Sequence, residues 1–233
     1  MKSLLALLGV AVAAPSLAAQ VGHDPARSPY RDLRYGQFVS LTVGKVFGAG
    51  GQLGIAPHDG QVAILRHDFL ADRPLSISLG GGYARLDRNY AVLAAVTDRL
   101  RGPVRHGVWF AEFIPQLNLV GGKTWRNLAP YVNVGLGVAR SDKVAADTSG
   151  YKFGTKFYLA PAAGVRIFVS RRLFVRLEAR SIFWNVGYPA RYRDDPDGPF
   201  GPEGPLLTSE LKEWTPTPIL HAGFGFAFRR PFF

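Results

Sequence analysis

The residues that could carry acid–base or nucleophilic chemistry in this sequence are its histidines, because the chain contains no cysteine. An imidazole activates a serine hydroxyl only when the two side chains can meet. None of the five histidines has a serine two residues later; they are His23, His58, His67, His106 and His221. His67 and Asp68 are neighbours in a strand-like segment, so their side chains point to opposite faces. The sequence therefore predicts no catalytic residue and no enzyme activity.

Oxygen ligands for a cation occur close together in the segment RYRDDPDGPFGPEGP, which contains Asp194, Asp195, Asp197 and Glu203. Carboxylates at such spacing could hold calcium. Asp, Pro and Gly are also turn formers, and the full spacing of a calcium-binding EF-hand is absent. We interpret the segment as a loop and predict no metal and no cofactor, while cation binding there stays open.

The elements that must position any such residue are strands. Eight segments alternate between apolar and polar residues with a period of two, and Gly, Pro and Asp clusters bound them. They are residues 36–48, 60–70, 74–86, 104–120, 127–141, 152–169, 171–187 and 214–230. Short and long connections alternate between them, as in an up-and-down membrane barrel with tight turns at one end and long loops at the other. We predict an all-β fold, an eight-stranded antiparallel up-and-down transmembrane β-barrel.

The alternation defines two faces of each strand. Val132, Val134, Leu136 and Val138 share one face of their segment, whereas Tyr131, Asn133, Gly135 and Gly137 share the other. A soluble barrel with its apolar face inward would show the same alternation. Four further features favour an apolar face toward lipid: the secretion signal, the terminal phenylalanine, the alternating loop lengths and strands longer than the usual ~5 to 6 residues.

Export is predicted by the start of the chain. Lys2, an apolar run and the small residues Ser16 and Ala18 match a cleavable secretory signal peptide at residues 1–18. Residues 19–34 contain prolines and read as a periplasmic linker, and residues 35–233 form the barrel domain. The net charge of +11 is spread over the strand-like segments instead of being clustered. It therefore indicates lipopolysaccharide or anionic lipid as a partner, and no nucleic acid.

With these features, residues 35–233 resemble the small bacterial outer-membrane β-barrels of the OmpA and OmpX type. The resemblance implies recognition by the outer-membrane assembly machinery through an aromatic last strand. Here that signal comprises Phe224, Phe226, Phe228, Phe232 and Phe233, of which Phe233 falls out of the alternating register. Some barrels of this size edit lipopolysaccharide acyl chains through a His-x-Ser arrangement, which this chain lacks.

The resemblance also implies an interior filled by charged side chains, because an eight-stranded barrel is only wide enough for side chains. The inward charges predicted here are Lys45, Glu112, Lys156, Arg166, Arg176, Glu178 and Arg180. Glu178 lies between Arg176 and Arg180 on one strand face, so we expect it to offset their mutual repulsion.

The function expected from the sequence is that of a monomeric outer-membrane barrel with a structural or surface-interaction role through four external loops. The alternatives are a small ion-conducting channel and a barrel enzyme that modifies lipid A. Interfacial girdles of aromatic residues accompany such barrels, and Trp109, Trp125, Trp184 and Trp214 fall near the ends of the predicted strands.

Overall fold

The computed structural model describes residues 28–229 except 34, 73, 93–98, 142–143, 148 and 194–203. The predicted signal peptide at residues 1–18 and most of the predicted linker lie outside the described residues, and so does the acidic segment from Asp194 to Glu203.

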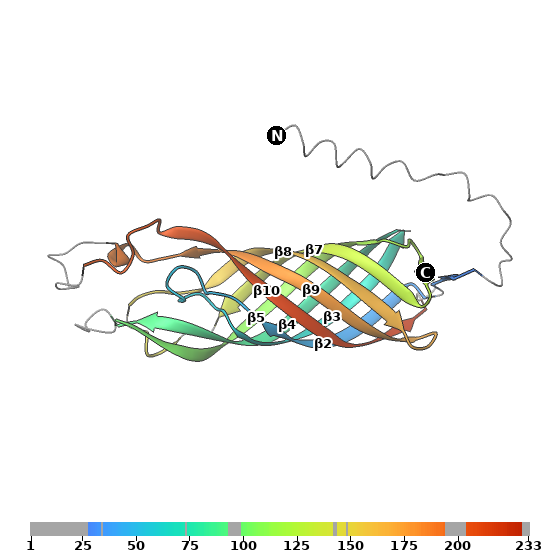
Figure 1. The fold of residues 1–233 in the computed structure, drawn as a ribbon, viewed down its shortest axis with the longest axis horizontal. Helices are drawn as coiled ribbons and strands as arrows, with labels where there is room; N and C mark the ends of the chain where they lie inside the picture. Colours follow the sequence, from blue (N-terminus) through green and yellow to red (C-terminus); the bar gives the residue numbers. More distant parts are fainter. Residues whose placement is uncertain are drawn as a thin grey trace, which may run out of the picture.

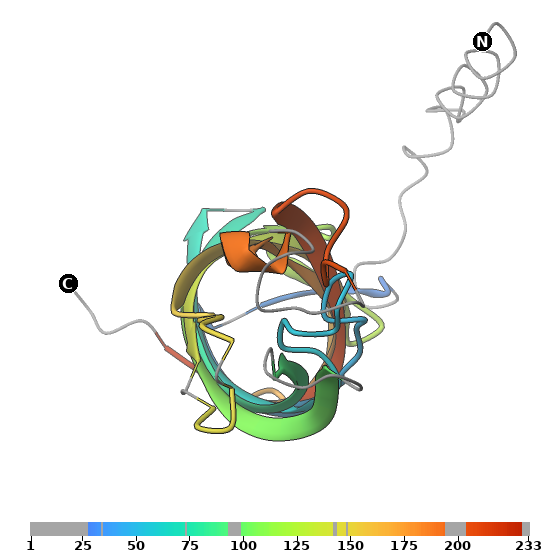
Figure 2. The same ribbon diagram turned by 90° about the vertical axis from the view of Figure 1, so that its left-hand side faces the viewer.

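Eight long strands of the described chain close into an antiparallel barrel, which confirms the predicted fold (Figures 1 and 2). Each strand pairs with the next, and the last pairs with the first. The strands are β2 (Gln37–Val46), β3 (Gly60–Asp72), β4 (Leu75–Ala91), β5 (Leu100–Asn118), β7 (Leu128–Ser141), β8 (Thr155–Phe168), β9 (Leu173–Gly187) and β10 (Lys212–Phe228).

The two ends of the barrel differ in their connections. Strand β2 begins and β10 ends at the same end, and the short connections β3–β4 and β8–β9 also lie there. We call this the turn end; it lies to the right in Figure 1. The connections 47–59, 92–99, 142–154 and 188–211 lie at the opposite end, which we call the loop end.

Two short strands at the turn end were not predicted. Strand β1 (Tyr30–Asp32) falls in the predicted linker, and β6 (Lys123–Trp125) falls in a predicted turn; the two pair antiparallel. The turn that joins β6 to β7 has positive φ at Arg126 and Asn127 (48° and 69°), which lets the chain reverse tightly. Three residues are too few to show an alternating pattern, so the sequence carried no signal for either strand.

The two barrel faces match the faces predicted from the alternation. Leu136, Phe157 and Phe224 point outward and are 50%, 80% and 76% exposed. Charged and polar side chains point inward and are buried. An apolar outside around a polar inside is the arrangement of a transmembrane barrel and the reverse of a soluble one. No helix among the described residues is long and apolar enough to cross a membrane.

Glycines on the inner face make room for aromatic rings of the neighbouring strand. Gly137 pairs directly with Tyr158, and Gly164 pairs directly with Tyr131. A Cβ atom added at either glycine would overlap the ring of its partner. This close approach explains why glycines recur opposite aromatic residues in the inward register.

Candidate functional site

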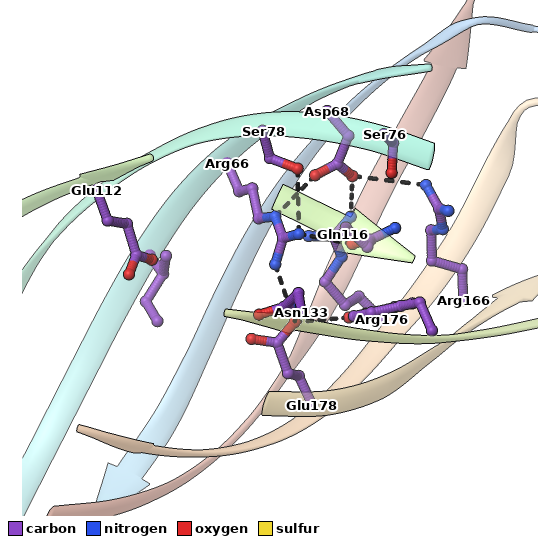
Figure 3. A network of polar contacts seen from close by, with 12 residues as sticks. Arg66, Asp68, Ser76, Ser78, Glu112, Gln116, Asn133, Arg166, Arg176 and Glu178 are labelled. Atoms are coloured by element: carbon purple, nitrogen blue, oxygen red, sulfur yellow. Dashed lines mark hydrogen bonds and ion pairs between the residues drawn. The ribbon is translucent and has the colours of Figure 1, made fainter. Parts of the chain in front are cut away.

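The centre of the barrel holds a buried network of charged side chains, which we call the interior network (Figure 3). Its first anchor is Asp68 on β3, which is 0% exposed. The carboxylate of Asp68 accepts a hydrogen bond from Nε of Arg66 at 2.7 Å and another from Arg176 of β9. Nη1 of Arg166 on β8 lies 3.6 Å from the same carboxylate. One carboxylate thus faces three guanidinium groups from three strands.

Arg66 links the interior network to the polar side chains of two further strands. Its Nη2 atom donates to Oγ of Ser78 at 3.1 Å and to Oε1 of Gln116 at 2.6 Å. The Asn118 side chain accepts hydrogen bonds from both Gln116, at 2.7 Å, and Arg166, at 2.6 Å. Strands β3, β4, β5 and β8 are therefore tied together inside the barrel by side-chain hydrogen bonds.

Glu178 on β9 is the second anchor. Its Oε2 atom accepts hydrogen bonds from Nη1 of Arg66 at 3.0 Å, from the Tyr131 hydroxyl at 2.8 Å and from Nδ2 of Asn133 at 3.2 Å. Its Oε1 atom lies 3.3 Å from Nε2 of His221, whose other ring nitrogen contacts Thr42. His221 is therefore a hydrogen-bonded member of the interior network.

Glu112 on β5 is the third anchor and lies closer to the loop end. Arg180 of β9 donates two hydrogen bonds to its carboxylate, one of them 2.7 Å from Nη1 to Oε1. The Tyr158 hydroxyl donates a third, at 3.1 Å. A bidentate pair of this kind is geometrically specific. It holds β5 and β9 at a fixed separation across the lumen.

The charges of the interior network nearly balance. Four guanidinium groups (Arg66, Arg166, Arg176 and Arg180) face three carboxylates (Asp68, Glu112 and Glu178), and all seven side chains are at most 5% exposed. Burying an ion is costly unless it is paired, and here every carboxylate has at least one guanidinium partner. The arrangement suits a structural brace.

The structure brings together five of the seven predicted interior charges: Glu112, Arg166, Arg176, Glu178 and Arg180. Lys156 points inward near the loop end and is only partly buried. The prediction for Lys45 was wrong. Lys45 has the same strand parity as Leu41 and Val43, so it lies outside the barrel, with Nζ 5.3 Å from the Phe47 ring. A lysine there reaches the lipid–water boundary, where its charge stays hydrated.

Arg66 and Asp68 are central to the interior network but were not predicted from the sequence. Both share their strand parity with Val62 and Ile64, so neither face of β3 is uniformly apolar or polar. In the sequence, Leu65 has the opposite strand parity to Arg66 and Asp68. The structure exposes Leu65 on the outer face. That parity places Arg66 and Asp68 inward.

Apolar side chains fill the barrel on the loop-end side of the interior network. We call this group the apolar plug; it includes Val46, Ile64, Leu86, Ile182, Trp184 and Ile219, each at most 4% exposed. One cavity lined by these side chains has a volume of about 10 Å³. Trp184 was expected in an interfacial girdle but points into the lumen, where Nε1 donates to Thr217 at 3.0 Å. Trp109, Trp125 and Trp214 are exposed on the outside.

A second apolar group closes the turn-end side of the interior network. Phe38, Phe168 and Phe174 are buried there, with ring centroids 5.5 to 6.3 Å apart. The guanidinium of Arg166 lies 4.5 Å from the centre of the Phe38 ring. The described lumen is therefore layered, with charge in the middle and packed apolar side chains on both sides.

An ion pair at the loop end joins β4 to the 142–154 connection. Arg88 at the end of β4 donates to Asp147 at 2.6 Å, and its guanidinium lies 5.1 Å from the centre of the Tyr151 ring. The hydroxyls of Ser149 and Tyr192 share a hydrogen bond between two different loops. Burial raises the pKa of Tyr192 to about 12. These contacts join the described parts of the 142–154 and 188–211 connections to one another and to β4 at the loop end.

The predicted assembly signal is described only in part. Phe224 and Phe226 point outward from β10 and are 76% and 41% exposed, and Phe228 is half-buried. Phe232 and Phe233 lie outside the described residues.

The histidines and acidic residues of the described chain form no metal-binding cluster of three or more side chains. His67 points outward, where its ring packs 4.0 Å from that of Phe69 and Nε2 lies 3.2 Å from the Gln37 side chain. His23 lies outside the described residues.

No protein-family model matches the chain, and no curated sequence matches it. Solved outer-membrane barrels are similar in fold. OprG from Pseudomonas aeruginosa is 12% identical with a TM-score of 0.47, over 87% of this chain and 100% of that chain. Neisserial surface protein A is 14% identical with a TM-score of 0.48, over 83% and 97%. AlkL is 14% identical with a TM-score of 0.43, over 91% and 99%.

Proposed function

We propose that this chain is a monomeric, non-conducting barrel of the bacterial outer membrane, whose loop end forms an ordered surface for interactions outside the cell. The observation that carries the proposal is the filled lumen. The interior network spans the barrel at mid-height, and the side chains of the apolar plug, each at most 4% exposed, pack on its loop-end side. An ion crossing this lumen would have to displace paired charges and packed apolar side chains together.

A belt of outward-facing basic residues at the loop end supports lipopolysaccharide as a partner. The belt comprises Lys45, Arg85, Arg105, Arg140 and Lys212, all exposed on the outer face near the loop-end limits of their strands. Apolar residues such as Val43 and Tyr83 lie next on the same face toward the middle of the barrel. Cations at this level would meet the phosphates of the outer leaflet, while the apolar band meets acyl chains.

Conductance in planar lipid bilayers tests the non-conducting barrel. We expect no discrete current steps from the folded protein, with a general porin prepared in the same detergent as the positive control. Reproducible steps that scale with the amount of folded protein, identified by its heat-modifiable migration on a gel, would contradict the proposal.

Two further experiments test the location and the absence of catalysis. Cell fractionation should place the protein in the outer membrane, and recovery as a soluble periplasmic protein would contradict the proposal. Mass spectrometry of lipid A should find the same acyl and phosphate pattern in cells with and without the protein. A shift in lipid A mass that requires the protein would instead favour the enzymatic alternative.

A further inference from the structure

A pocket of about 640 Å³ opens at the turn end of the barrel, away from the interior network and from the loop surface. We call it the mouth pocket. Leu33, Tyr35 and Val169 supply partly or fully exposed apolar surface to its lining, whereas Phe38 and Phe168 of the same lining are buried. Pockets of this volume are typical of small-molecule sites.

The walls of the mouth pocket are held by backbone hydrogen bonds. Strand β1 pairs with β6, and the Leu33 amide donates to the Gly122 carbonyl at 2.9 Å. The Arg126 amide donates to the Pro29 carbonyl, also at 2.9 Å. The Phe168 amide donates to the Asn127 carbonyl at 2.9 Å, which fixes the opposite wall. The N-terminal segment is therefore built into the barrel mouth.

Three donor side chains line the mouth pocket without using their donors inside the protein. The side chains of Arg31, Arg171 and Asn127 make no hydrogen bond and no ion pair with any residue that the structure describes. They come from three different segments, and all three residues are exposed to solvent at the pocket. Their unused donors could hold an acceptor that bridges the pocket walls.

The electrostatic environment of the mouth pocket favours an anion. Its lining carries two guanidinium groups, Arg31 and Arg171, and one carboxylate, Asp32. Behind Phe38 lies Arg166, a member of the interior network, in which four arginines face three carboxylates. Apolar walls focus the field of such charges into a pocket.

We propose that the mouth pocket binds a small soluble organic anion with a flat apolar body. Its carboxylate or phosphate group would bridge Arg31 and Arg171, with Asn127 as a further donor. Its apolar body would pack on Leu33 and Tyr35, which are only partly buried. In the proposed orientation of the barrel the turn end faces the periplasm, which would be the source of the ligand. Binding in detergent does not depend on that orientation.

Calorimetric titration of the folded full-length protein with phenyl phosphate tests the proposal, in an uncharged detergent and a buffer without phosphate. We expect saturable binding of phenyl phosphate, and binding at least about tenfold weaker for inorganic phosphate and for neutral benzyl alcohol. Arg31→Gln and Arg171→Gln should each weaken binding by about tenfold.

Arg126→Gln is the matched control. Arg126 is the neighbour of Asn127 in the β6–β7 turn, but its guanidinium stacks on the Trp125 ring and the residue does not line the pocket. Heat-modifiable gel migration confirms that each variant is folded. Absence of saturable binding, or equal affinity in Arg31→Gln, Arg171→Gln and Arg126→Gln, would overturn the proposal. Tighter binding of the short-chain lipid dihexanoylphosphatidylglycerol than of phenyl phosphate would overturn the assignment to a soluble anion.

Discussion

Nη1 of Arg66 on β3 lies 3.0 Å from Oε2 of Glu178 on β9, although these strands do not pair and are separated in the barrel by β2 and β10. The ion pair therefore crosses the lumen. Glu178 lies between Arg176 and Arg180 on its own strand, but those arginines reach Asp68 and Glu112 on other strands. The charges of β9 are therefore compensated across the interior, whereas Arg66 and Asp68 of β3 pair along one strand.

The first prediction concerns the loss of the Glu178 charge. Glu178→Gln removes one of the two carboxylate partners of Arg66 and leaves four buried guanidinium groups facing two carboxylates. Breaking a buried ion pair by removing one partner costs about 3 to 5 kcal/mol. Urea unfolding in lipid vesicles measures the change in the free energy of unfolding. The control is Glu210→Gln on an exposed loop position, for which a change within about 0.5 kcal/mol is expected. Similar small effects of both substitutions would refute the bracing role of Glu178.

The second prediction separates the outward Lys45 from the inward Arg180. Lys45→Gln should change the free energy of unfolding by no more than about 0.5 kcal/mol, because the side chain is exposed outside the barrel. Arg180→Gln should cost about 3 to 5 kcal/mol, since it leaves Glu112 buried without its ion pair. The same vesicle assay compares the two. An equal cost would mean that Lys45 belongs to the interior after all.

The third prediction concerns the fit of Tyr158 against Gly137. A Cβ at position 137 overlaps the Tyr158 ring, which is also held by its hydrogen bond to Glu112. Gly137→Ala should therefore lower the free energy of unfolding by about 1 to 3 kcal/mol, as overpacked cores do. Gly187→Ala is the control, because a Cβ there meets no atom within 4 Å. Equal stability of the two variants would show that the ring shifts freely.

The fourth prediction concerns alkaline pH. Burial raises the pKa of Tyr192 to about 12 from the usual value of about 10. The folded protein thus holds the phenolic proton more tightly, so this contribution to stability is complete below about pH 10 and is lost as the pH rises through about 12. The difference in tyrosinate absorbance between the parent and Tyr192→Phe should titrate near pH 12. A midpoint near pH 10 would show that the loop contact is open.

The long strands could be predicted from the sequence because their alternation extends over ten or more residues. The partner of Glu178 could not, because it depends on which side chains of non-adjacent strands reach the same height in the lumen. Lys45 shows a different error. Its parity with Leu41 and Val43 pointed outward, but its charge suggested the interior. Charge alone is a poor guide near strand ends, where the outer face leaves the hydrocarbon.

The mouth pocket could not be foreseen either. It depends on the pairing of β1 with β6, and each of these strands has only three residues. Its two guanidinium groups come from positions far apart in the sequence, in the N-terminal segment and the β8–β9 turn. Only the closed barrel brings these segments to one opening.

The central claim, an apolar exterior around an occluded lumen, is tested most directly by tryptophan quenching in lipid vesicles. Two single-tryptophan proteins are compared, with the other tryptophans replaced by Phe; one retains Trp109, which is 60% exposed, and the other Trp184, which is 2% exposed. Brominated lipid should quench Trp109 strongly and Trp184 much less, and aqueous iodide should quench Trp184 hardly at all. Strong iodide quenching of Trp184, or no lipid quenching of Trp109, would contradict the account.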